Sequence, residues 1–151
     1  MASRFTNSLM RSDVQEEKKL AHHITRPDWL STPARERRGY IEPKLLRELW
    51  FHTGTICNLS CPFCLEGSKP GDDRLNMVTI EDAVPFIDEA LGLGVERFSF
   101  TGGEPFVVKD LVKILDYALD YRSCLVLTNA TVPLHRRFED ILPLKHKPNT
   151  L

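Results

Sequence analysis

Three cysteines lie close together in the sequence, at positions 57, 61 and 64, with the spacing CxxxCxxC. Thiolates are ligands that proteins use for zinc and for iron–sulfur clusters. A structural zinc site takes four protein ligands, usually as two pairs joined by a longer spacer. Because only Cys57, Cys61 and Cys64 are local, they would leave one iron of a four-iron cluster without a protein ligand, and a small molecule could bind there. Zinc or an electron-transfer cluster is the alternative interpretation.

The fourth cysteine, Cys124, stands apart from this group, inside a short apolar run over 124–128. A free cysteine in such surroundings behaves as a small hydrophobic side chain. We therefore predict that Cys124 is a core residue and not a ligand. The even number of cysteines then has no structural meaning, and we expect no disulfide.

Two further polar clusters follow segments that have the composition of β-strands. The first contains Gly102, Gly103, Glu104 and Pro105, and the second contains Thr128 and Asn129. Glycine lacks Cβ, so its backbone can approach a ligand closely. A carboxylate accepts hydrogen bonds, and proline fixes φ and so holds a turn. Each cluster by itself could also be an ordinary turn at the end of a strand.

The elements that must position these residues alternate between strand and helix. Strands are predicted over 45–53, 95–101 and 124–128, and helices over 79–92, 108–121 and 133–141. This alternation indicates an α/β fold with a parallel sheet built from right-handed crossover units. The last strand is a continuous apolar run, which is typical of a parallel strand covered on both faces. All three polar clusters follow strands, so we expect them at the carboxyl edge of the sheet, where α/β barrels build their active sites.

The start of the first helix has a local signal of its own. Thr79 can cap the helix, and Asp82 stands three residues further on, as in a capping box. The apolar residues that follow recur at helical spacing up to Leu91, and Gly92 and Gly94 end the pattern.

Taken together, the three motifs resemble those of the radical S-adenosylmethionine (radical SAM) enzymes. Phe63 stands just before the last cysteine, and 102–105 is similar to the GGEP element of that family. The stretch 128–131 is similar to the family's TNGT stretch, with Ala130 in place of glycine. The resemblance covers about 45–141.

This resemblance implies a partial (β/α) barrel of the radical SAM type. It would comprise about three parallel βα units over 44–151. The preceding residues, 1–43, lie outside the resemblance; they are poor in apolar side chains and contain three prolines, so we expect an irregular N-terminal extension with a short helix near 14–24. Because a radical SAM core has more βα units than these, we expect the chain to be the N-terminal half of a longer enzyme.

The resemblance also implies a ligand set. Cys57, Cys61 and Cys64 would hold a 4Fe-4S cluster, and the methionyl amine and carboxylate of SAM would bind its open iron. Phe63 would lie beside the adenine, and Glu104 would accept hydrogen bonds from the SAM amino group. The remaining cofactor contacts would come from Gly102, Gly103, Pro105, Thr128 and Asn129.

The implied activity is reductive cleavage of SAM to methionine and a 5′-deoxyadenosyl radical, which abstracts hydrogen from a substrate. An electron donor such as flavodoxin or ferredoxin would be a partner, and the substrate could be a small molecule or a peptide. The general pattern resembles the branch that contains molybdenum-cofactor synthesis enzymes and peptide- or protein-modifying maturases. The alternative function is a non-catalytic fragment that binds an iron–sulfur cluster or zinc.

Composition excludes several other classes of function. The chain has 151 residues and a formal net charge of −1, which argues against the strongly basic face of a nucleic-acid-binding protein. No apolar run reaches the ~18–20 residues that a membrane-spanning helix needs. We expect a cytoplasmic protein. The charges at 72–74 are predicted to be solvated, with contact to a substrate as the alternative. His52 is predicted to be packed or solvated, with a position facing the site as the alternative.

Overall fold

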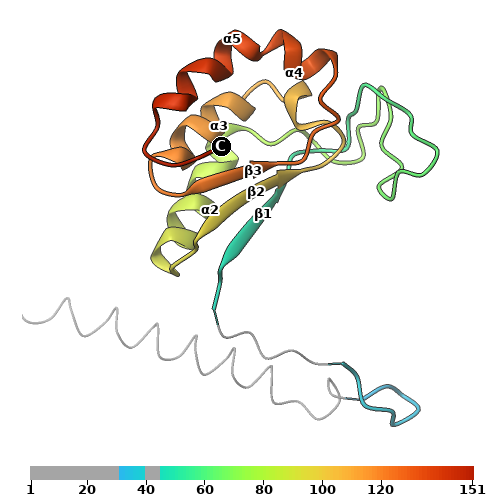
Figure 1. Ribbon diagram of the computed structural model, residues 1–151. Coiled ribbons are helices and arrows are strands. Elements are labelled where there is room, and N and C mark those ends of the chain that lie inside the picture. Colours follow the sequence, from blue (N-terminus) through green and yellow to red (C-terminus); the bar gives the residue numbers. More distant parts are fainter. Residues whose placement is uncertain (1–30, 40–44) are drawn as a thin grey trace, which may run out of the picture. The chain divides into compact units, whose positions relative to one another are not determined.

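The computed structural model of the protein describes residues 31–39 and 45–151. Contacts divide the chain into two units, 1–43 and 44–151 (Figure 1). In the first unit, Ser31 and Arg37 form an isolated antiparallel bridge around a turn in which Arg35 has a φ of 64°. The helix predicted near 14–24 lies outside the described residues.

The second unit is built on a three-stranded parallel sheet with strand order β1-β2-β3 (Figure 1). The strands are β1 Glu48–His52, β2 Arg97–Thr101 and β3 Ser123–Val126. The α-helices are α2 Ile80–Gly92, α3 Leu111–Leu119, α4 Val132–Arg136 and α5 Phe138–Ile141. Two 3₁₀ helices, η2 Pro105–Val107 and η3 Leu142–His146, complete the unit. The predicted α/β fold with three parallel βα units is confirmed.

The helix α2 begins as its sequence predicts. The Thr79 hydroxyl accepts from the Asp82 N–H, and the Asp82 carboxylate accepts from the Thr79 N–H at 3.1 Å, so the capping box is complete. Its end is also local in origin, because Gly94 follows the C-cap with a φ of 84° that favours glycine.

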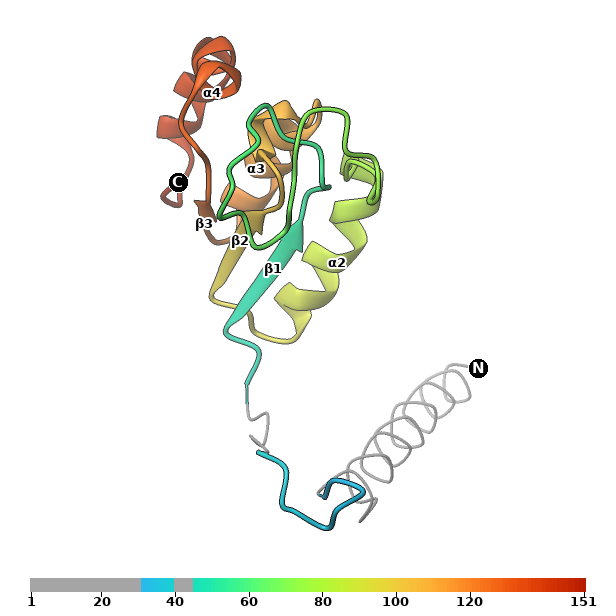
Figure 2. The same ribbon diagram turned by 90° about the vertical axis from the view of Figure 1, so that its right-hand side faces the viewer.

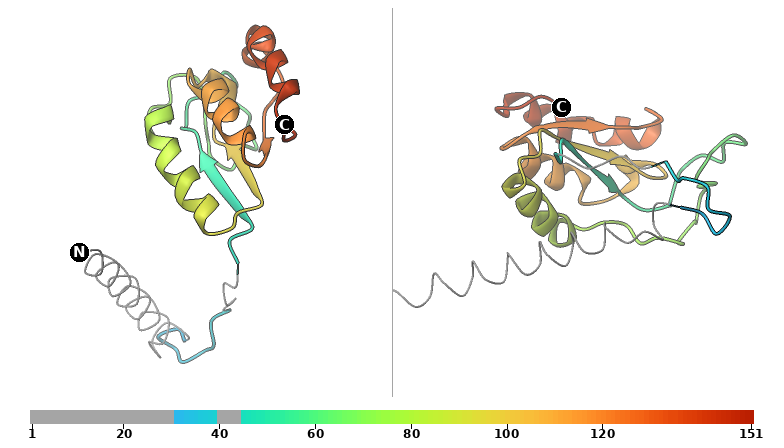
Figure 3. Two further views of the ribbon diagram at one scale, coloured as in Figure 1. Left: turned by 90° about the vertical axis from the view of Figure 1, so that its left-hand side faces the viewer. Right: turned by 90° about the horizontal axis from the view of Figure 1, so that it is seen from below.

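The core lies between the sheet and the helices α2 and α3, which pack on the same side of it (Figures 2 and 3). Phe51, Phe100 and Val126 are opposite one another in the register, and the rings of Phe51 and Phe100 stack with centroids 5.3 Å apart. Phe98 and Phe100 are fully buried. Burying a large aromatic side chain stabilises the fold by about 2–3 kcal/mol, so β2 is a main anchor of the unit.

The prediction for β3 is wrong in one respect. The strand is parallel, but it ends at Val126, and the helices within residues 45–151 pack against only one side of the sheet, so this part of the chain does not cover the strand on both faces (Figure 2). On the opposite face Trp50 is 45% exposed, and Leu127, just beyond β3, is 49% exposed. The apolar run therefore reflects one packed face and one open face.

The third helix is also divided where one continuous helix was predicted. Arg137 stands between α4 and α5 with φ −101° and ψ 5°, which interrupts the helical backbone. Its guanidinium donates to the carbonyl oxygens of Val108 and Lys109 at 3.4 and 3.2 Å, so the break is tied to the segment before α3. Among the described residues, no helix is long and apolar enough to cross a membrane.

Candidate functional site

The three predicted cysteine ligands lie on the loop that leaves the carboxyl end of β1 and returns to α2 (Figure 1). All three are free thiols with partly exposed side chains. The Cys57 N–H donates to the Lys69 carbonyl at 3.3 Å, and the Cys64 N–H donates to the Cys61 carbonyl at 3.1 Å. We call residues 57–64 the cysteine loop. The first bond ties the start of the loop to the chain that follows it, and the second forms a turn within the loop. The three cysteines remain partly exposed.

Gly102 and Gly103 pack directly against the segment that enters the cysteine loop. The Gly103 N–H donates to Gly54 O at 2.9 Å, and the Glu104 N–H donates to Ile56 O at 3.0 Å. A Cβ on Gly103 would lie 2.2 Å from Ile56 O, and a Cβ on Gly102 would lie 2.6 Å from Gly54 O. These glycines are therefore required for the close approach of two backbones. Their predicted contact with a ligand stays a prediction.

Glu104 is a buried carboxylate with 1% of its surface exposed. Its Oε1 accepts from the Phe106 N–H at 3.0 Å and from the Thr128 hydroxyl at 2.8 Å. Its Oε2 accepts from the Asn129 N–H at 2.8 Å. The side chain thus joins the ends of β2 and β3. Its predicted hydrogen bond to the SAM amino group would have to be made beside three bonds that it already makes within the protein.

A Glu104→Gln substitution should weaken the fold, because the new amide nitrogen would face the Thr128 or Asn129 donor and leave it unsatisfied. We expect the free energy of unfolding of the metal-free chain to fall by about 2 kcal/mol, measured by urea denaturation. Glu89→Gln, on the exposed face of α2, is the matched control and should change the midpoint little. Equal midpoints for the two variants would contradict the structural role of Glu104.

The turn after β3 touches the cysteine loop through side-chain amides. The Asn129 Nδ2 donates to Asn58 Oδ1 at 3.0 Å, and the Asn58 Nδ2 donates to the Thr131 hydroxyl at 2.9 Å. Ala130 has a φ of 54°, in the left-handed region that favours glycine. Adopting this conformation costs an alanine about 1 kcal/mol in free energy. Asn58 and Thr131 were not among the predicted site residues, although Asn58 follows Cys57 directly.

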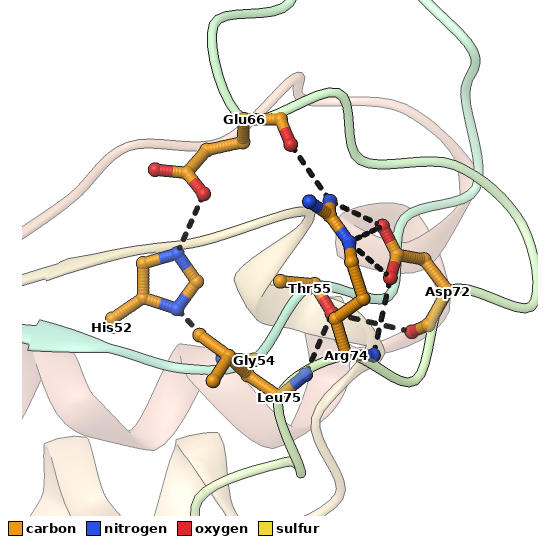
Figure 4. A network of polar contacts seen from close by, with 7 residues as sticks. All are labelled: His52, Gly54, Thr55, Glu66, Asp72, Arg74 and Leu75. Carbon is orange, nitrogen blue, oxygen red and sulfur yellow. Dashed lines mark hydrogen bonds and ion pairs between the residues drawn. The ribbon is translucent and has the colours of Figure 1, made fainter.

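A network of polar contacts closes the base of the cysteine loop on its other side (Figure 4). Asp72 and Arg74 form a multiple-contact ion pair, in which Arg74 Nη2 lies 2.6 Å from Asp72 Oδ2. The same guanidinium donates to the Glu66 carbonyl at 2.7 Å, two residues after Cys64. The hydrogen bonds from Arg74 hold the pKa of Asp72 well below its usual range. The prediction that Asp72 is solvated is wrong, because the ion pair lets its carboxylate be buried.

This lowered pKa predicts how stability depends on pH. Since Asp72 in the folded chain is more acidic than its ordinary value of 3.8, its contribution is complete above that pH and is lost as the pH falls below it. We expect the stability of the metal-free wild type to fall more steeply below about pH 4 than that of Asp72→Asn. Urea denaturation at several pH values measures this. Asp73→Asn, at the exposed neighbouring position, should keep the wild-type slope; equal slopes for wild type and Asp72→Asn would refute the ion pair's contribution.

The remaining residues discussed from the sequence differ in how far their side chains are exposed. Phe63 is 83% exposed on the cysteine loop. Pro105 is buried at the start of η2, whose N-cap is Glu104. His52 is partly exposed, with its Nε2 3.3 Å from Glu66 and its Nδ1 accepting from the Gly54 N–H (Figure 4). Cys124 is buried in β3, and burial raises the pKa of its thiol to about 12, as expected for a core residue and not a ligand.

The side chains of the site can be compared with what a zinc ion or an iron–sulfur cluster needs as ligands. Among the described residues, no three His, Cys, Asp or Glu side chains are gathered closely enough to hold a metal ion, and this includes the three thiols of the cysteine loop. The number, spacing and partial exposure of these thiols are what fit a cluster that takes three thiolates. In the same region, the buried hydroxyls of Thr53 and Ser68 have no hydrogen-bond partner within the described part of the chain. A buried hydroxyl of this kind calls for a partner from outside the protein, such as a water, an ion or a ligand.

Comparisons with known proteins agree with this arrangement. The curated relatives include the GTP 3′,8-cyclase of Ectopseudomonas mendocina (strain ymp), which is 34% identical over 59 residues, or 39% of this chain and 18% of that protein. The GTP 3′,8-cyclase of Campylobacter jejuni subsp. jejuni serotype O:6 (strain 81116 / NCTC 11828) is 32% identical over 77 residues, or 50% of this chain and 24% of that protein. The aligned part of this chain thus spans about a fifth to a quarter of the length of these relatives.

The sequence profile of the Radical SAM superfamily matches residues 51–149. This range begins in β1, contains the cysteine loop and includes both polar clusters that follow β2 and β3. The match therefore covers every residue that the motifs assigned to the site. The chain belongs to the radical SAM superfamily.

Proposed function

We propose that this chain is the cluster- and SAM-binding part of a radical SAM enzyme. The observation that carries the proposal is the meeting of three segments at one edge of the sheet. The Gly103–Glu104 backbone is hydrogen-bonded to the segment that enters the cysteine loop, and the Thr128–Thr131 turn is hydrogen-bonded both to the Glu104 side chain and to Asn58 of the loop. Parallel α/β sheets place their active sites at this carboxyl edge.

The proposed ligands of a 4Fe-4S cluster are Cys57, Cys61 and Cys64. The chemistry that such a cluster supplies when bound is one electron for the cleavage of SAM to methionine and a 5′-deoxyadenosyl radical, which takes a hydrogen atom from substrate. The protein's own residues present and orient these groups. Glu104 fixes the ends of β2 and β3 to each other, and the Asp72–Arg74 pair fixes the backbone after Cys64.

The remaining site residues have proposed contacts with SAM. The partly exposed Asn129 and Thr128 border the loop from the β3 side, so they would contact the ribose or the carboxylate. Phe63 is exposed beside Cys64 and is free to cover the adenine. The partly exposed Gly102 and Gly103 would contact the methionyl end of SAM.

The substrate and partners of the whole protein are part of the same proposal. GTP is the first substrate to test, because the relatives are named for a reaction of GTP. A low-potential donor such as flavodoxin or ferredoxin would supply the electron. Free thiols and a cluster of this kind suit the reducing conditions of the cytoplasm.

The test of this proposal is the metal content of the full chain after anaerobic reconstitution with iron and sulfide in the presence of competing zinc. We expect about four iron and about four labile sulfide per chain. About one zinc and no labile sulfide would instead support the alternative of a non-catalytic metal-binding fragment.

A further inference from the structure

The side chain of Asn58 makes two hydrogen bonds that only an amide can make together. Its Oδ1 accepts from Asn129 Nδ2 at 3.0 Å, while its Nδ2 donates to Thr131 Oγ1 at 2.9 Å. These bonds span about seventy residues of sequence and connect the cysteine loop to the turn after β3. A carboxylate could not donate, and an alanine could make neither bond.

The orientation of the Asn129 amide is fixed by the same turn. Its Oδ1 accepts from the Thr131 N–H at 3.1 Å and from the Thr131 hydroxyl, so its Nδ2 must point toward the cysteine loop. There it lies 3.9 Å from the sulfur of Cys57, within hydrogen-bonding range for sulfur. The Leu59 N–H also donates to this sulfur, at 3.4 Å.

Of the three thiols on the loop, only Cys57 receives hydrogen bonds at its sulfur from residues that the structure describes. The sulfurs of Cys61 and Cys64 are partly exposed without such donors in this part of the chain. Cys57 is therefore the proposed ligand whose sulfur the protein already contacts in the metal-free chain. The contact from outside the cysteine loop comes from Asn129, in the turn after β3.

We propose that Asn58 is a positioning residue: it holds the Asn129 amide against the sulfur of Cys57, so that the turn after β3 supports this one ligand. The role as a cluster ligand rests on the proposed function, but the contact itself does not. Hydrogen bonds to a ligating sulfur withdraw electron density and raise the reduction potential of an iron–sulfur cluster. Loss of Asn58 should therefore loosen Cys57 selectively and make the cluster harder to reduce.

The experiment is alkylation of the metal-free full chain with iodoacetamide, with the rate at each cysteine followed by mass spectrometry. It is run at about pH 9.5, above the ordinary thiol pKa range, so that rates report shielding. In Asn58→Ala we expect Cys57 to react several-fold faster, while Cys61 and Cys64 keep their rates. Thr131→Val, which removes the other partner of the Asn58 amide, should act in the same direction and serves if Asn58→Ala does not fold.

The matched control is Asn149→Ala, which removes an asparagine that donates to Leu119 O at 2.8 Å away from the loop. It should leave all three rates unchanged. An unchanged Cys57 rate in the Asn58 and Thr131 variants, or an equal increase at all three cysteines, would overturn the proposal. In the reconstituted chain, Asn58→Ala should have a more negative reduction potential than Asn149→Ala, and equal potentials would also overturn it. If the wild type binds no cluster, the proposed function fails, whereas the alkylation comparison still decides this inference.

Discussion

Cys61→Ala is expected to abolish the binding of the iron–sulfur cluster. Cys61 is a partly exposed free thiol in the middle of the cysteine loop and one of its three proposed ligands. Two thiolates cannot hold a cluster that needs three protein corners. After anaerobic reconstitution and desalting, iron and labile sulfide should fall to the background level.

Cys124→Ala is the control for this experiment. Cys124 is buried in β3, where burial raises the pKa of its thiol, and we expect it to take no part in metal binding. This variant should retain the iron and sulfide of the wild type. A Cys61→Ala chain that still held a full cluster, or a Cys124→Ala chain that lost it, would contradict the ligand assignment.

Gly103→Ala should be among the most damaging substitutions outside the cysteines. The added Cβ would lie 2.2 Å from Ile56 O and 2.7 Å from Thr55 O, both backbone atoms held by the sheet and the loop. The two backbones would have to separate, which breaks the hydrogen bond from Glu104 N–H to Ile56 O. We expect a loss of at least about 3 kcal/mol in the free energy of unfolding, with loss of cluster binding.

Gly92→Ala provides the same chemical change without the clash. A Cβ there would meet no heavy atom within 4 Å, and Gly92 lies at the end of α2. Replacing a helical glycine by alanine is expected to be neutral or to stabilise by about 0.5–1 kcal/mol. Urea denaturation of both variants measures the difference. If the two variants unfold at the same midpoint, the close approach at Gly103 does not constrain the site.

The parts of the fold that depend on local sequence could be predicted well. The capping box of α2, the alternation of strands and helices and the parallel order all follow from spacing along the chain. Because both polar clusters follow strands, the sequence also predicts that they lie at the carboxyl edge of the sheet, and they do follow β2 and β3.

What the sequence could not supply was the partner of each site residue. The glycines pack against the segment that enters the cysteine loop, and the side chain of Glu104 binds the turn after β3, because backbone segments far apart in sequence meet there. The contacts of Asn58 with residues 129 and 131 are long-range, and no local pattern encodes them. The division of the last helix at Arg137 likewise depends on carbonyl groups that precede α3.

We propose that the chain binds SAM at a cluster held by Cys57, Cys61 and Cys64. The most direct test is to reduce the reconstituted full chain anaerobically, add SAM, and record the electron paramagnetic resonance spectrum together with the products. We expect SAM to change the spectrum of the reduced cluster and to be converted to 5′-deoxyadenosine and methionine in equal amounts. A reduced cluster whose spectrum SAM leaves unchanged, with no cleavage products, would contradict it.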